Sequence, residues 1–173
     1  VGLIPYALAE AAERLALSFA EYRQSPNDTH AQQKCLVWAG QMAHYAQDLC
    51  QPLHTTIHYD GKVKADGTSP RSGIHRKVDA LVTALHTSPQ ALAAGQKVAP
   101  VAQLTPAIRA QLTRSHSLVP RVYALEPKLK AGASQREVNA FAMERARESV
   151  RFTAALYATA WQLSASLKLP SRR

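Results

Sequence analysis

Two short stretches of the chain each place a histidine and an aspartate four residues apart. The first pair is His44 and Asp48, and the second is His75 and Asp79. In an α-helix, positions i and i+4 lie one turn apart on the same face. Both stretches lie in patterns typical of helices, so each presents an imidazole beside a carboxylate. The chain is therefore expected to fold around two helices that carry these polar pairs.

A further histidine follows the first pair in the segment Gln51-Pro52-Leu53-His54. Proline ends or kinks a helix because it lacks an N–H and clashes with the preceding turn. Imidazole nitrogen and carboxylate oxygen are ligands that zinc takes in proteins. The candidate ligands are His44, Asp48, His54, His75 and Asp79. Taken singly, each pair is better explained as a surface ion pair or a core histidine with a satisfied hydrogen bond.

Hydrophobic periodicity predicts an all-α bundle of about five or six helices. We expect helices over residues 3–24, 29–49, 73–85, 91–98, 105–125 and 134–167. The fifth is expected to break at Pro120, and Ser134 with Glu137 forms a predicted capping box for the last. Turn residues in 55–73 predict a loop.

The length of 173 residues suits one domain spanning residues 1–173. The sequence contains no apolar run of the length that crosses a membrane, and no signal peptide is visible in it. If the two cysteines, Cys35 and Cys50, lie on one helix, about 22 Å separates them. A disulfide between them is not expected, because its geometry requires a much shorter distance.

The net charge of +9 is unevenly distributed along the chain. Residues 1–60 contain three Lys and Arg against six Asp and Glu, whereas residues 61–173 contain eighteen against six. A basic region favours an anionic partner, such as a phosphodiester, a nucleic acid or a lipid surface. Basic helices with a solvated surface explain the same charge. A nucleic-acid-binding module is a further alternative, and the charge is the only feature that supports it.

The order of these motifs resembles the zinc-dependent phospholipase C / S1/P1 nuclease superfamily. The shared pattern is a helical His-x3-Asp, a Gln-Pro-Leu-His turn and a second His-x3-Asp or His-x3-Glu, here beginning at His44, Gln51 and His75. The resemblance implies a helical bundle that hydrolyses phosphodiesters with hydroxide formed on metal-bound water. It also implies up to three zinc ions, an anionic phospholipid or nucleic-acid substrate, and a secreted or periplasmic location.

The same resemblance assigns a role to each ligand. His44 and Asp48 would serve one zinc ion, and Asp48 would also bridge to a second and act as the catalytic residue. The complete protein site for a further zinc ion would consist of His54, His75 and Asp79. Considered together and in this order along the chain, the five ligands favour a metal site over a surface ion pair or a core histidine.

The chain departs from the family pattern at several points. The N-terminal Trp, the two His and the Asp that complete the other zinc sites have no counterpart, so we expect the chain to lack the N-terminal segment of the domain. Val78 stands where the nuclease branch has Trp, and Asp79 stands where the phospholipase branch has Glu. Residues 3–6, which lead into the first predicted helix, resemble the phospholipase branch more than the nuclease branch. The alternative is a non-catalytic, metal-depleted binding or scaffold relative of the same fold.

Overall fold

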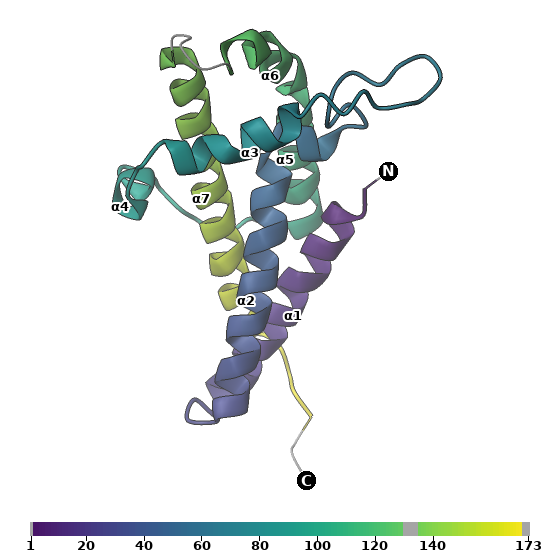
Figure 1. Cartoon of the computed structure of the whole chain (residues 1–173). Helices are drawn as coiled ribbons and strands as arrows, with labels where there is room; N and C mark the ends of the chain where they lie inside the picture. The colour runs from purple at the N-terminus through teal and green to yellow at the C-terminus, as the bar shows by residue number, and fades with distance from the viewer. Residues whose placement is uncertain (1, 130–134, 171–173) are drawn as a thin grey trace.

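The computed structural model describes residues 2–129 and 135–170 and shows a bundle of helices (Figure 1). No strand occurs within these two ranges, so the all-α prediction is confirmed. The elements are α1 (Ile4–Gln24), α2 (Thr29–Cys50), the short 3-10 helix η1 (Pro52–Thr55), α3 (Ile74–Ala84), α4 (Pro89–Ala93), α5 (Leu104–Ser117), α6 (Val119–Leu125), the 3-10 helix η2 (Glu126–Lys128) and α7 (Arg136–Ser164).

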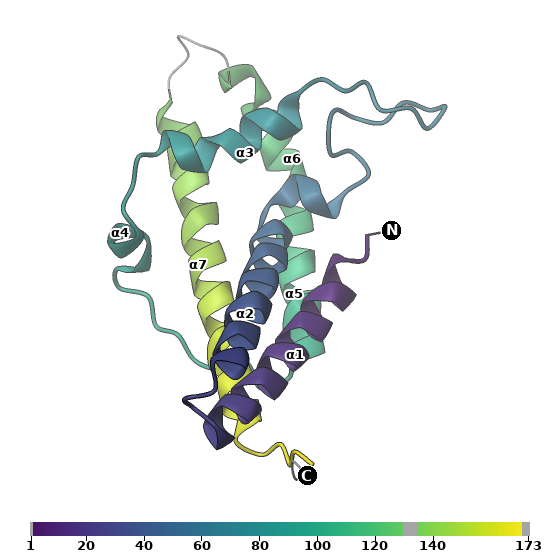
Figure 2. The same cartoon turned by 60° about the horizontal axis from the view of Figure 1, so that its bottom comes forward.

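Four long helices, α1, α2, α5 and α7, run along the molecule, and α3 crosses one end of them (Figures 1 and 2). The most extensive helix pairing is between α1 and α2, and α7 packs against both. The loop between η1 and α3 extends away from the bundle at the end where α3 lies (Figure 2). This arrangement brings the C-terminal end of α2, η1 and α3 together.

A first hydrophobic cluster fills the space between the long helices. Its apolar residues recur every three or four positions, which places them on one face of each helix. Its largest fully buried members are Leu8, Leu15, Met42, Leu49, Ile108 and Leu156. Trp38 and Tyr45 are partly buried and pack against it.

A second hydrophobic cluster lies where α3 crosses the bundle. It consists of Leu53, Ile74, Val78, Val122, Leu125, Val138 and Phe141. These residues come from η1, α3, α6 and α7, so the cluster joins η1, which carries His54, to α3, which carries His75 and Asp79.

The two helices that carry the His-x3-Asp pairs begin and end close to the expected residues. The Asp28 side chain caps α2 by accepting hydrogen bonds from the N–H groups of His30 and Ala31. Gly73 precedes α3 with a φ of 77°, a left-handed conformation that costs little for glycine.

The helix predicted over residues 91–98 is misplaced. It begins at Pro89, because the Ser88 hydroxyl accepts a hydrogen bond from the Ala91 N–H and caps the first turn. It ends at Ala93, just before Gly95 turns the chain with a φ of 70°.

Two further boundaries differ from the expectation. The break in the segment 105–125 falls at Leu118 rather than at Pro120, which lies in the first turn of α6, where its missing N–H costs little. The last helix ends at Ser164 rather than at 167. The predicted Ser134 cap lies outside the described residues.

None of the described helices has both the length and the apolar character needed to cross a membrane.

Both cysteines are free thiols, which confirms that the chain forms no internal disulfide. Burial raises the pKa of Cys50 to about 12, and the nearby Glu148 acts in the same direction. Cys50 is therefore protonated and unreactive at neutral pH.

We expect iodoacetamide at pH 8 to alkylate Cys35 in the folded protein and to leave Cys50 intact, because Cys35 is only half-buried. Mass spectrometry of peptides before and after unfolding measures both rates, and equal rates in the folded protein would contradict the buried placement.

The Cys50 thiol lowers the stability of the fold at high pH. Its pKa in the unfolded chain is the ordinary 9.0, so stability falls as the pH rises from 9.0 toward about 12.

Candidate metal centre

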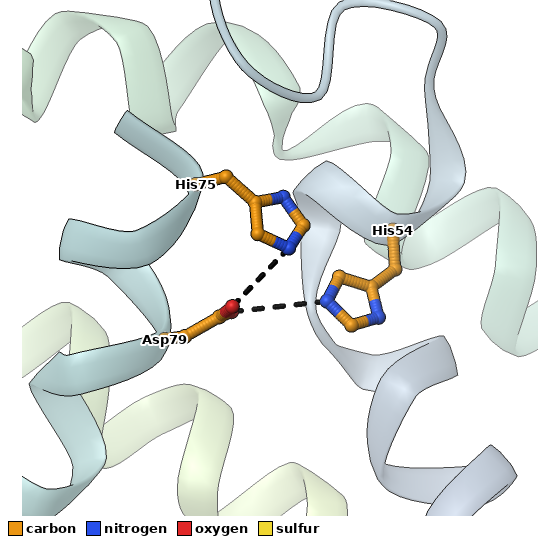
Figure 3. A group of neighbouring side chains, drawn as sticks. All are labelled: His54, His75 and Asp79. Carbon is orange, nitrogen blue, oxygen red and sulfur yellow. Dashed lines mark ion pairs between the residues drawn. The ribbon is translucent and has the colours of Figure 1, made fainter. Parts of the chain in front are cut away.

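Three of the predicted ligands, His54, His75 and Asp79, meet at the end of the bundle (Figure 3). One nitrogen or oxygen of each lies within 4.8 Å of the others. His75 Nε2 is 3.1 Å from Asp79 Oδ2, and His54 Nε2 is 3.7 Å from Asp79 Oδ1. Figure 3 shows the three side chains pointing toward one another from η1 and α3.

Each of these ligands directly follows a buried residue of the second cluster. The pairs are Leu53 with His54, Ile74 with His75 and Val78 with Asp79. Successive residues point about 100° apart in an α-helix and about 120° apart in a 3-10 helix. The buried residue therefore fixes the backbone, and the ligand that follows it emerges at the edge of the cluster.

The loop between η1 and α3 holds His75 from the other side. The Asp60 carboxylate accepts a hydrogen bond from the His75 N–H at 3.4 Å, in the first turn of α3. The ring of Tyr59 meets the His75 ring edge-on, with centroids 5.8 Å apart. The loop predicted over residues 55–73 thus contributes to the site, although it supplies no member of the three-ligand group.

The two imidazoles lie parallel, with ring centroids 4.8 Å apart and planes 7° apart. His54 Nε2 and His75 Nδ1 are buried and have no hydrogen-bond partner. Leaving a buried polar atom without a partner is unfavourable. His54 Nε2 faces Asp79, so a cation between them would use the free nitrogen, and the residues present fit a bound metal ion.

The other two predicted ligands, Asp48 and His44, lie next to the three-ligand group: Asp48 contacts His54, and His44 contacts Asp48. Asp48 Oδ1 is 3.4 Å from His54 Nδ1, and Asp48 Oδ2 is 3.4 Å from His44 Nε2. Neither Asp48 nor His44 belongs to the three-ligand group, and the His44 side chain is 66% exposed. Asp48 instead contacts the His54 nitrogen that points away from Asp79. A carboxylate in that position commonly orients a metal-binding histidine.

Two residues at the site were not predicted to contribute to it. Gln51 was noted only as part of the turn motif, yet its amide donates a hydrogen bond to Asp79. His116 is exposed, but its Nδ1 lies 3.0 Å from the carbonyl oxygen of Thr55 and connects α5 to η1. Both contacts join residues far apart in the sequence, and no local pattern signals them.

A cavity of about 480 Å³ opens beside the centre. Asp48, His54 and Asp79 form part of its lining. Its other walls come mainly from apolar side chains of α3, α4 and α7, namely Val78, Leu81, Val82, Leu92, Phe141, Ala142, Ala146 and Val150. Arg145 also lines it; one guanidinium nitrogen bonds to Glu144 at 2.7 Å, whereas its Nε is buried without a partner.

Comparison of the chain with models of protein families, with curated proteins and with solved structures gave no match. The resemblance to the phospholipase C / S1/P1 nuclease superfamily therefore remains a prediction from the residues themselves.

Proposed function

We propose that the chain binds zinc through His54, His75 and Asp79 and acts in the hydrolysis of phosphodiesters. The observation that carries this proposal is the convergence of two imidazoles and one carboxylate within 4.8 Å. Three such ligands with a fourth position left for water or substrate are typical of catalytic zinc sites. When bound, zinc would polarise the phosphoryl oxygen and lower the pKa of a water molecule.

Asp48 has two roles in this proposal. Its contact with His54 Nδ1 favours the proton on that nitrogen, which leaves Nε2 free to bind the metal. Asp48 also lines the cavity, so its carboxylate can accept a proton from water that approaches a bound substrate. The predicted catalytic role of Asp48 is thereby retained as part of the proposal.

The cavity favours a phospholipid over a nucleic acid as the substrate. Its walls are mainly apolar, which suits the acyl chains of a lipid ester. Arg145 adds a guanidinium group, which binds phosphate oxygens well. Exposed Arg76 and Lys77 on α3 are next to His75 in the sequence and attract an anionic ligand.

The contacts among the site residues also favour the second candidate, a binding or scaffold domain without metal. Each carboxylate oxygen of Asp48 and Asp79 already faces a histidine nitrogen. The histidines therefore contact both aspartates without a cation between them. The two candidates differ in whether the centre binds zinc and whether hydrolysis follows.

We expect the zinc-loaded chain to hydrolyse short-chain phosphatidylcholine, and Asp79→Asn to lower the rate by more than about 100-fold, because losing a ligand costs more than losing an outer partner. Asp66→Asn, in the exposed part of the loop, is the matched control. Zinc binding without hydrolysis of either phosphatidylcholine or a dinucleotide would support the scaffold candidate. A chain that binds no zinc would overturn the proposed function.

A further inference from the structure

Gln51 stands at the junction between α2 and η1. Pro52 follows it and restricts its backbone to an extended conformation, here φ −90° and ψ 117°. In this conformation its N–H donates to the carbonyl of Asp48 at 3.0 Å, and its own carbonyl accepts from the N–H of His54 at 3.1 Å. The backbone of Gln51 is therefore bonded to two of the predicted site residues.

The side chain of Gln51 reaches a third. Its Oε1 accepts a hydrogen bond from the Leu53 N–H, and its Nε2 donates to Asp79 Oδ1 at 2.8 Å. These two partners determine the orientation of the amide. The reverse orientation would place the amide nitrogen against an N–H and the amide oxygen against a carboxylate. Gln51 therefore presents a donor to Asp79.

This hydrogen bond connects the two segments that carry the ligands. Gln51 precedes η1, which carries His54, whereas Asp79 lies on α3, 28 positions further along the chain. The Asp79 side chain is 43% exposed, and the Gln51 amide donates a hydrogen bond to it from outside α3. With Oδ1 held by the amide, Oδ2 stays 3.1 Å from His75 Nε2.

We infer that Gln51 is the positioning residue of the metal centre, and that its amide holds the Asp79 carboxylate in the orientation that binds metal. The inference rests on the proposed zinc site. The mechanism is preorganisation, because a carboxylate already oriented loses less side-chain freedom when the metal binds.

The test uses Gln51→Met, which keeps the length of the side chain and removes both polar atoms. We expect its zinc affinity to fall by about 10–100-fold, the usual cost of losing an outer partner of a ligand. Competition with a chromophoric chelator measures the affinity. We also expect the visible absorption spectrum of the cobalt(II)-loaded protein to change, since that spectrum reports the geometry of the ligands. Gln51→Asn, whose shorter amide cannot reach both partners, should act in the same direction.

Two controls separate this role from general loosening of the structure. Gln32→Met replaces an exposed glutamine of α2, whose amide donates a hydrogen bond to the Pro26 carbonyl, and should leave zinc affinity unchanged. His116→Ala removes the contact with Thr55 and loosens η1 without touching Asp79. It should stay within about threefold of the wild type in zinc affinity, well below the loss expected for Gln51→Met.

The outcomes distinguish this inference from the proposed function. A wild-type chain that binds zinc while both Gln51 variants match its affinity and its cobalt spectrum would overturn the positioning role alone. An equal loss in His116→Ala would also overturn it, because placement of η1 would then explain the effect. A wild-type chain that binds no zinc would overturn the proposed function and this inference together.

Discussion

Replacing His54 with alanine is expected to abolish zinc binding at micromolar concentrations of the metal while the bundle stays folded. His54 supplies the buried Nε2 that has no hydrogen-bond partner, and Asp48 contacts the opposite nitrogen of its ring. Without this side chain the centre keeps one imidazole and one carboxylate, fewer than the three protein ligands typical of a catalytic zinc site. The loss should therefore exceed the ~10–100-fold cost of removing an outer partner.

Isothermal titration with zinc measures this effect directly. His30→Ala is the matched control, because His30 is an exposed histidine at the opposite end of α2. Far-ultraviolet circular dichroism shows whether each variant keeps its helices. A His54→Ala chain that binds zinc as tightly as the wild type would mean that the metal is held elsewhere.

Leu53→Ala is expected to cause the largest loss of stability among the substitutions considered. Leu53 is completely buried and packs in the second cluster with residues of α3, α6 and α7. Truncating a buried leucine leaves a cavity and costs about 2–5 kcal/mol of unfolding free energy. The exposed Leu36, on α2, is the matched control, and Leu36→Ala should change stability by no more than about 0.5 kcal/mol. Urea denaturation of the metal-free proteins measures both values.

Leu53→Ala also tests whether the second hydrophobic cluster supports the metal centre. Because Leu53 anchors the backbone of His54, its truncation should also weaken zinc binding, and saturating zinc should restore part of the lost stability. Leu36→Ala should bind zinc as tightly as the wild type and gain the same stability from it. A Leu53→Ala chain with wild-type stability would contradict the role of the second cluster as the support of the ligands.

The sequence predicts the helices that carry the site because spacing within one helix is a local property. His44 with Asp48, and His75 with Asp79, lie at i and i+4, and each pair forms a contact in the structure. The order of the motifs also places His54 beside them. The convergence of His54, His75 and Asp79 is consistent with the predicted complete site, and their metal remains a proposal.

Other features depend on contacts that no local pattern contains. The bond from Gln51 to Asp79 and the contact of His116 with Thr55 exist only because η1 packs between α3 and α5. The placement of Asp48 between two histidines depends on how the chain turns after α2. Within a single helix, the start of α4 also differs from the prediction. The Ser88 hydroxyl caps the first turn, so the helix begins at Pro89 rather than at 91, where the weak apolar periodicity placed it.

The measurement that tests the zinc site most directly is X-ray absorption at the zinc edge on protein loaded with zinc and then dialysed. We expect one zinc ion per chain, bonded to two imidazole nitrogens and at least one carboxylate oxygen at about 2.0–2.2 Å. The zinc signal should disappear in His54→Ala. A chain that emerges from dialysis without zinc, or one whose zinc is bonded to sulfur, would contradict the proposed centre.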